Sequence, residues 1–92
     1  MVTAIVLINV ERPKLKDVVK EILAVEGISE VHTVAGEYDL AAIIRVKDNS
    51  KLSEIVVNKM PHHIPGIIHT KTLIALQSNA KIDLEAAFGL KS

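Results

Sequence analysis

The residue types best suited to binding a small ligand meet at one turn between two apolar stretches, Gly36-Glu37-Tyr38-Asp39. Gly36 can adopt a positive φ angle and leaves its amide exposed as a hydrogen-bond donor. Asp39 can bind an ammonium group, or it can accept hydrogen bonds from the turn backbone. Tyr38, the only tyrosine of the chain, combines an apolar ring with a polar tip. The turn therefore favours a site for a small amphipathic ligand, with an ordinary hairpin turn as the alternative.

A second group of polar side chains lies on the last predicted strand. Thr70 and Thr72 are two residues apart, so their hydroxyls share one face of that strand. Two hydroxyls on one face can orient a carboxylate or an amine. Threonine is also a good strand former, so a solvent-facing pair without a ligand is the alternative.

The four histidines are the remaining candidates for catalysis or metal binding. His62 and His63 lie in a loop bounded by prolines, and adjacent histidines rarely chelate one metal ion without further ligands. His32 and His69 fall on predicted strands and could line a pocket, but a catalytic histidine needs a nucleophile or an orienting carboxylate. The chain has no cysteine, P-loop, dinucleotide fingerprint or nucleophile elbow. We therefore predict no catalytic residue, no metal and no cofactor.

The composition is that of one small domain rich in aliphatic side chains. The chain has 92 residues, 49% of them hydrophobic, yet it contains one tyrosine, one phenylalanine and no tryptophan. A domain of this size hides only part of such apolar surface in its own core, which favours self-association. The 11 basic and 11 acidic residues balance, unlike those of a nucleic-acid-binding surface. The N-terminal apolar run is too short to span a membrane and lacks a basic leader, so we expect a cytoplasmic protein.

Hydrophobic periodicity predicts the elements that position these residues. An apolar run over Val2–Asn9 indicates a buried strand. Apolar residues at helical spacing follow Pro13 and recur between a capping cluster at Asp48 and a stop at Pro61, which indicates two amphipathic helices. The two apolar stripes consist of Leu15, Val18, Val19, Ile22 and Leu23, and of Leu52, Ile55, Val56 and Met60. The other strands are expected over Ile28–Ala35, Asp39–Val46 and Ile67–Leu76.

The element order β-α-β-β-α-β and a weak internal repeat indicate the fold. Each half reads strand, helix, Gly-Ile and strand, with Gly27-Ile28 in the first half and Gly66-Ile67 in the second. This order is typical of a split βαβ unit with right-handed crossovers. We therefore predict an α+β domain of ferredoxin-like type, with a four-stranded antiparallel sheet and two helices on one face.

Both faces of the predicted sheet are apolar, although the helices would cover only one of them. On the first strand, one face carries Val2, Ala4, Val6 and Ile8 and the other carries Ile5 and Leu7. On the third strand, one face carries Leu40, Ala42, Ile44 and Val46 and the other carries Ala41 and Ile43. The uncovered face therefore needs a partner, and a second copy packed sheet against sheet is the simplest one.

The predicted domain covers residues 1–78, and residues 79–92 form a tail after the last strand. The tail holds Ile82, Leu84 and Phe88, which can form a small apolar patch. We expect it to dock on the domain or on a neighbouring subunit, with a frayed end as the alternative.

These motifs resemble the effector-binding domain of the Lrp/AsnC, or feast/famine, transcription regulators. In that family a strand leads into Gly-x-Tyr-Asp and an apolar strand, which matches Gly36-Glu37-Tyr38-Asp39-Leu40 here. A helix then leads to Pro-Gly-Val/Ile and a strand with alternating threonines, which matches the segment from Pro65 to Thr72. The similarity covers nearly the whole chain, roughly residues 3–77.

The resemblance implies a domain that dimerises sheet to sheet, with dimers assembling further into octamers or decamers. A small effector, commonly an amino acid, would bind between dimers. The effector-binding residues that the resemblance implies are Thr33, Val34, Ala35, Gly36, Glu37, Tyr38 and Asp39 in the loop, and Thr70 and Thr72 on the last strand. An amino acid would present its ammonium group to Asp39, and its carboxylate to amides near Gly36 or to the two threonines.

Full-length members of the family carry an N-terminal helix-turn-helix domain, whereas this sequence begins at the first predicted strand. We therefore expect a stand-alone, non-catalytic module that forms homo-oligomers, binds an amino-acid effector and contacts neither nucleic acid nor membrane directly. An effect on transcription would then need a partner, such as a full-length paralogous regulator in the same assembly.

Two other classes of protein share the predicted fold. Small dimeric α+β barrel enzymes, such as monooxygenases and isomerases, use a cavity between sheet and helices, where His32 or His69 would be the base. The shortage of aromatic residues and the lack of a His-carboxylate spacing count against this reading. Regulatory amino-acid-binding domains appended to enzymes usually pair their sheets edge to edge, whereas the apolar open face favours face-to-face pairing.

Overall fold

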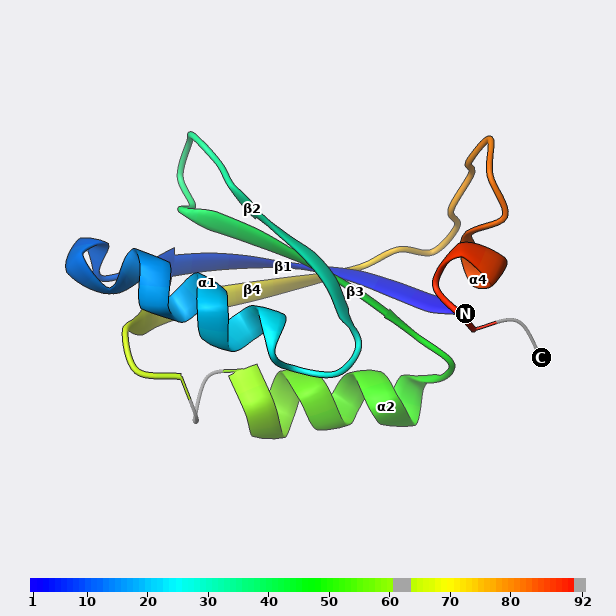
Figure 1. The fold of residues 1–92 in the computed structure, drawn as a ribbon, viewed down its shortest axis with the longest axis horizontal. Coiled ribbons are helices and arrows are strands. Elements are labelled where there is room, and N and C mark those ends of the chain that lie inside the picture. Colours follow the sequence, from blue (N-terminus) through cyan, green and yellow to red (C-terminus); the bar gives the residue numbers. More distant parts are fainter. Residues whose placement is uncertain (61–63, 91–92) are drawn as a thin grey trace.

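A four-stranded antiparallel sheet with the strand order β2-β3-β1-β4 organises the domain (Figure 1). The computed structural model describes residues 1–60 and 64–90, so the predictions about His62 and His63 lie outside the described residues. The strands are β1 (Val2–Val10), β2 (Ile28–Thr33), β3 (Leu40–Val46) and β4 (Ile67–Ile74). The helices are α1 (Leu15–Leu23), preceded by a 3-10 turn (Arg12–Lys14), α2 (Asn49–Ser53), continued by a π-helical segment (Glu54–Lys59), and α4 (Leu84–Ala87) in the tail.

The strand order and the placement of the helices confirm the predicted ferredoxin-like α+β fold. The two crossover connections carry α1 and α2, and both helices lie on the same side of the sheet (Figure 1). None of the helices within the described ranges is long and apolar enough to cross a membrane.

The core lies between the sheet and these two helices and is entirely aliphatic apart from one methionine. Alternate residues of β1 and β3 are buried, as the alternation in the sequence predicts. They are Ala4, Val6, Ile8 and Val10 on β1 and Leu40, Ala42, Ile44 and Val46 on β3. The helical side packs Val18, Ile22, Leu52, Ile55 and Met60 against them. No polar side chain of the described residues is buried, so this core serves packing and contains no polar pocket.

The connection between β2 and β3 is wider than the tight turn that the sequence predicts. It spans residues 34–39, because the Asp39 amide donates a hydrogen bond to the carbonyl of Ile8 on β1 (3.0 Å). The Val34 amide donates to the carbonyl of Asp39 (3.0 Å) and closes the loop. The predicted strand limits at Ala35 and Asp39 are therefore wrong, and a six-residue loop joins the strands.

Three other element boundaries or burial assignments differ from the prediction. β4 ends at Ile74 instead of Leu76, and the last backbone hydrogen bond to β1 is donated by the Ala75 amide to the Thr3 carbonyl (2.8 Å). Leu76 is consequently 100% exposed. Leu23 is predicted in the buried stripe of the first helix, but it lies at the last residue of α1 and is 52% exposed. β1 extends one residue further than predicted, to Val10.

The helix layer covers β1 and β3 but leaves the outer strand β4 uncovered. Ala4 and Ile8 of β1 are completely buried, whereas their cross-strand partners on β4, Ile74 and Thr70, are exposed. Thr72 is half-buried on the same side. The predicted pair of threonines therefore lies on the helix side of the sheet but outside the core.

The other side of the sheet, which we call the open face, has an apolar centre. Ile5 and Leu7 of β1 are paired with Ile43 and Ala41 of β3, and all four side chains are half-buried. Helices α1 and α2 lie on the opposite side of the sheet (Figure 1). The predicted apolar open face is thus present.

Candidate functional site

The loop over residues 34–39 is anchored to the end of β1 by Asp39. One carboxylate oxygen of Asp39, Oδ2, accepts a hydrogen bond from the Val10 amide (3.0 Å), and the Asp39 amide donates to Ile8. These two bonds to β1 fix the position of the carboxylate. The second oxygen, Oδ1, has no hydrogen-bond partner among the described residues, so a ligand could use it.

Gly36 lies in the same loop in a conformation that suits glycine. Its φ angle is 132°, a region that residues with a side chain rarely adopt. A Cβ atom placed there would meet no other atom within 4 Å, so the space around this backbone is open. Tyr38 and Asp39 are half-buried, whereas Val34, Ala35, Gly36 and Glu37 are exposed. The loop therefore combines an exposed backbone at Gly36, the half-buried ring of Tyr38 and the carboxylate of Asp39, which β1 holds in place.

The predicted threonines do not join this loop within one protomer. Thr33, Leu40, Ile8 and Thr70 are successive partners across the sheet, from β2 to β4. Three strand spacings of about 4.8 Å put Thr33 and Thr70 roughly 14 Å apart, on opposite edges. Thr72 follows along the same outer strand. A ligand the size of an amino acid cannot contact both edges of a single chain.

The two described histidines lie on the open face and in no enclosed cavity. His32 is 56% exposed, and its Nε2 lies 3.2 Å from Oε1 of Glu30. The predicted lack of a His-carboxylate spacing is therefore wrong for His32, because residues two apart on a strand share a face. His69 is exposed and pairs with Asn9 of β1. Within the described ranges, no three His, Asp or Glu side chains are grouped as a metal site.

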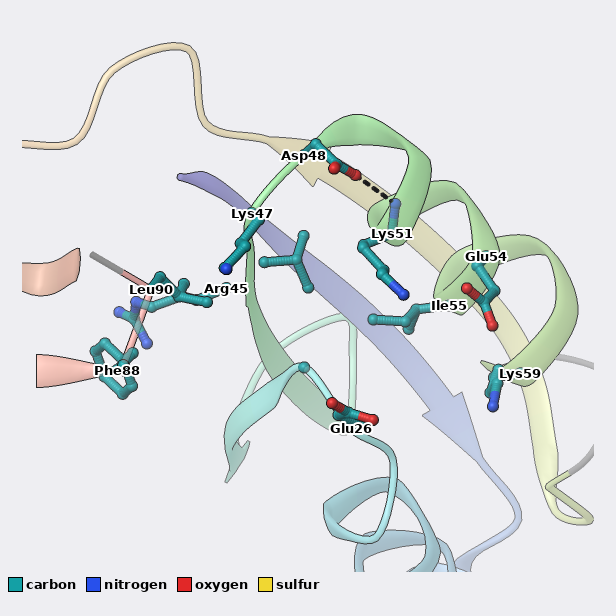
Figure 2. A pocket seen from close by; sticks show the side chains of 13 residues that line it. Glu26, Arg45, Lys47, Asp48, Lys51, Glu54, Ile55, Lys59, Phe88 and Leu90 are labelled. Carbon is teal, nitrogen blue, oxygen red and sulfur yellow. Dashed lines mark hydrogen bonds between the residues drawn. The ribbon is translucent and has the colours of Figure 1, made fainter. Parts of the chain in front are cut away.

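A cleft of about 550 Å³ lies at the other end of the sheet (Figure 2). It is formed by the end of β3, the turn that precedes β2, α2 with its π-helical continuation, and the tail. Its charged lining residues are Glu26, Arg45, Lys47, Asp48, Lys51, Glu54 and Lys59, and its apolar lining includes Val46, Ile55 and Phe88. The sequence shows no sign of this cleft, because its residues come from four separated segments.

The charged groups of the cleft serve the local structure or face solvent. Oδ1 of Asp48 accepts a hydrogen bond from the Lys51 amide (2.9 Å) and caps α2, as the sequence predicts. Nη1 of Arg45 donates to Oγ of Ser29 (2.6 Å), and the guanidinium lies 4.4 Å from the centre of the Phe88 ring. The lysines and Glu54 are exposed. The cleft is therefore a weaker ligand-site candidate than the loop with its positioned carboxylate.

The tail contacts the domain at this same end of the sheet. Besides the contact between Phe88 and Arg45, the N-terminal ammonium group of Met1 lies 3.7 Å from Oε2 of Glu85. Figure 1 shows α4 beside the start of β1, far from the β2–β3 loop at the other end. Ile82 is 64% exposed, so the tail residues do not form a buried patch of their own.

These features define a class of protein. It is a ferredoxin-like α+β domain with an apolar open face and an exposed loop that offers polar groups to a small ligand. Residues 3–81 match the family model of the Lrp/AsnC ligand binding domain. The chain therefore belongs to the Lrp/AsnC ligand-binding domain family, which confirms the resemblance seen in the Gly36–Asp39 and Pro65–Thr72 motifs.

The relatives of this chain include named transcription regulators. The helix-turn-helix transcriptional regulator FL11 of Pyrococcus abyssi is 32% identical over 76 residues, which cover 83% of this chain and 49% of FL11. The chain spans 39% to 49% of the length of the curated relatives that it matches. It is thus similar to one domain of such regulators.

Solved structures share the fold over nearly the whole chain. TTHA0845 from Thermus thermophilus is 31% identical, with a TM-score of 0.78 over 88% of this chain and 100% of TTHA0845. The transcriptional regulator NMB0573 from Neisseria meningitidis, solved in complex with L-Met, is 13% identical, with a TM-score of 0.66 over 94% of this chain and 58% of that chain. At 13% identity, this second likeness shows the fold alone.

Proposed function

We propose that this domain is a non-catalytic, self-associating module that binds a small amino acid and modulates transcription regulators. The observation that carries the proposal is the Asp39 carboxylate, which β1 holds through Oδ2, while Oδ1 has no partner among the described residues and the open backbone of Gly36 lies in the same loop. A ligand ammonium group would donate to Oδ1, and the ligand carboxylate would accept from amides near Gly36. The ring of Tyr38 would contact the ligand side chain.

A complete site needs more than one subunit. Thr70 and Thr72 could bind the ligand carboxylate, but they lie on the opposite edge of the sheet from the loop, roughly 14 Å away by strand spacing. The loop of one subunit and β4 of another would therefore share the ligand, between dimers that are formed sheet to sheet. A ligand that binds one assembly better than another shifts the equilibrium between them.

Membership of the ligand-binding domain family supports this reading, and L-Met in the NMB0573 complex belongs to the proposed ligand class. The proposal includes homo-oligomers, from dimers to octamers or decamers, in the cytoplasm. Control of transcription would pass through a full-length paralogous regulator that joins the same assembly. Co-expression with such a regulator should give mixed oligomers in native mass spectrometry, and purely homo-oligomeric species would contradict this part.

The binding proposal is tested by calorimetry and light scattering together. The wild-type chain is titrated with each of the common amino acids, and its mass is measured with and without an amino-acid mixture. We expect heat from one or a few amino acids, a change in assembly, and at least tenfold weaker binding in Asp39→Asn. Glu21→Gln removes an exposed carboxylate on α1, outside the loop, and should bind as the wild type does. No heat with any amino acid and an unchanged mass would refute the proposal.

A further inference from the structure

The open face carries charged side chains around its apolar centre, namely Glu30 and His32 on β2, Arg45 on β3 and Lys71 on β4. Cross-strand pairing defines two neighbouring rows of side chains on this face. In the order β2, β3, β1, β4, one row is Glu30, Ile43, Ile5 and Leu73, and the next is His32, Ala41, Leu7 and Lys71. Glu30 and Lys71 thus lie on opposite edges of the sheet, and Arg45 of β3 lies beside Glu30.

Glu30 is the only acidic residue of the sheet. Strands β1, β3 and β4 contain no aspartate or glutamate, and β2 contains Glu30 alone. The Glu30 side chain is 43% exposed, with Oε1 at 3.2 Å from His32 and Oε2 at 3.9 Å from Nη1 of Arg45. It therefore still presents a carboxylate to any molecule that covers the open face.

Lys71 is the matching group on the other edge and has no ion-pair partner among the residues that the structure describes. It is exposed on β4, and within the described ranges no carboxylate forms an ion pair with it. Three strand spacings separate β4 from β2, so Lys71 and Glu30 of one chain are roughly 14 Å apart. Glu30, the one carboxylate of the sheet, therefore cannot reach the Lys71 ammonium group of its own chain, whereas that of a second copy can.

We propose that a second copy of the chain covers the open face with Lys71 opposite the Glu30–His32 pair of the partner subunit. The inference rests on the sheet-to-sheet dimer of the proposed function and specifies its orientation. A twofold axis parallel to the strands lays β4 of one sheet over β2 of the other, so each dimer contains the pair twice. A twofold axis across the strands would instead bring β4 over β4 and place two Lys71 ammonium groups near each other.

The apolar centre and the charged edges have different roles in this dimer. Ile5, Leu7, Ile43 and the 44%-exposed Leu73 supply the apolar area that a partner buries. The charges at the rim add modest affinity but penalise the wrong orientation, because like charges would then face each other. Face-to-face sheets lie about 10 Å apart, a gap that a lysine and a glutamate extending toward each other can bridge.

Charge reversal tests the pairing with a built-in rescue. Glu30→Lys and Lys71→Glu each place two like-charged pairs in a homodimer, and each should weaken dimerisation about tenfold at low salt. A mixture of the two variants restores both pairs in the heterodimer, as does the double variant in its homodimer. Lys16→Glu, the same charge change on the exposed side of α1, is the matched control.

Sedimentation equilibrium and native mass spectrometry give the outcome. Heterodimers that exceed homodimers by about tenfold in the mixture, with recovery in the double variant, would support the pairing. Dimers without any recovery would refute the pairing and leave the sheet-to-sheet dimer intact, whereas a monomeric wild type would refute the dimer itself. If Glu30→Lys does not fold, the single variant Lys71→Gln tests the pairing. This variant should abolish the salt dependence of dimerisation, and an unchanged salt dependence would refute the pairing.

Discussion

Replacement of Asp39 separates the structural role of its carboxylate from the role proposed in ligand binding. Its Oδ2 accepts a hydrogen bond from the Val10 amide at 3.0 Å, and Val10 is 4% exposed. A hydrogen bond to a charged group contributes about 1.5–3 kcal/mol, and a buried amide without a partner costs a similar amount. Because Asp39 is half-buried and water can reach the loop, we expect Asp39→Ala to lower the free energy of unfolding by about 1–2 kcal/mol.

Asp39→Asn keeps an oxygen acceptor for the Val10 amide and removes the charge. Its free energy of unfolding should therefore fall by less than about 1 kcal/mol, while binding of a ligand ammonium group is lost. Urea unfolding at one fixed protein concentration measures the first quantity, because self-association makes stability depend on concentration. Calorimetry with the amino acids that bind the wild type measures the second.

Two results would refute this reasoning about Asp39. If Asp39→Ala unfolds at the same urea concentration as the wild type, the hydrogen bond to Val10 does not anchor the loop. If Asp39→Asn binds amino acids with unchanged affinity, the carboxylate is not the anchor for the ammonium group. Glu21→Gln, at an exposed carboxylate on α1 outside the loop, controls for a general effect of charge and should change neither measurement.

Three further substitutions test packing, capping and the tail. Gly27→Ala should lower the free energy of unfolding by about 2 kcal/mol and the melting temperature by roughly 10 °C, since φ is 98° and the added Cβ would lie 2.6 Å from a buried isoleucine side chain. Gly36→Ala, where φ is 132° but the surrounding space is open, should lower the free energy of unfolding by less. Equal losses in the two variants would contradict the packing argument. Asp48→Ala should cost about 1 kcal/mol in urea unfolding through the lost N-cap, and Asp48→Asn should recover most of it. Phe88→Ala should lose about 0.5–1 kcal/mol from its contact with Arg45 and speed proteolysis of the tail, whereas unchanged cleavage would show that this contact does not hold the tail.

The fold was predictable because local patterns and global packing agree on β1 and β3. Burial of every second residue, such as Val6 and Ala42, follows the period of a strand, and the apolar residues between them reveal a second apolar face. The width of the β2–β3 loop was not predictable. It depends on hydrogen bonds from the Val10 amide and to the Ile8 carbonyl, which join Asp39 to residues far away in the chain.

The second helical segment shows where apolar spacing alone misleads. Leu52, Ile55 and Met60 are buried, with spacings of three and then five residues, and Val56 is only half-buried. A regular α-helix does not fit the second spacing. The Met60 amide donates to the carbonyl of Ile55, a π-helical bond that rotates Met60 back toward the core. The sequence pattern was compatible with an ordinary helix, so the wide turn could be recognised only in the structure.

Successive side chains of the outer strand β4 face opposite sides of the sheet. The proposed dimer contact and the proposed effector site therefore use different residues of this strand. Thr70 and Thr72 are paired with residues of β1 that face the helices, whereas Lys71 and Leu73 lie on the open face. A partner that covers the open face therefore leaves both threonines on the outside of the dimer. The effector site would then be completed only when a second dimer brings its β2–β3 loop against β4 of the first. Because each residue of β4 serves one side only, effector binding would control the assembly of dimers while the dimer itself stays intact.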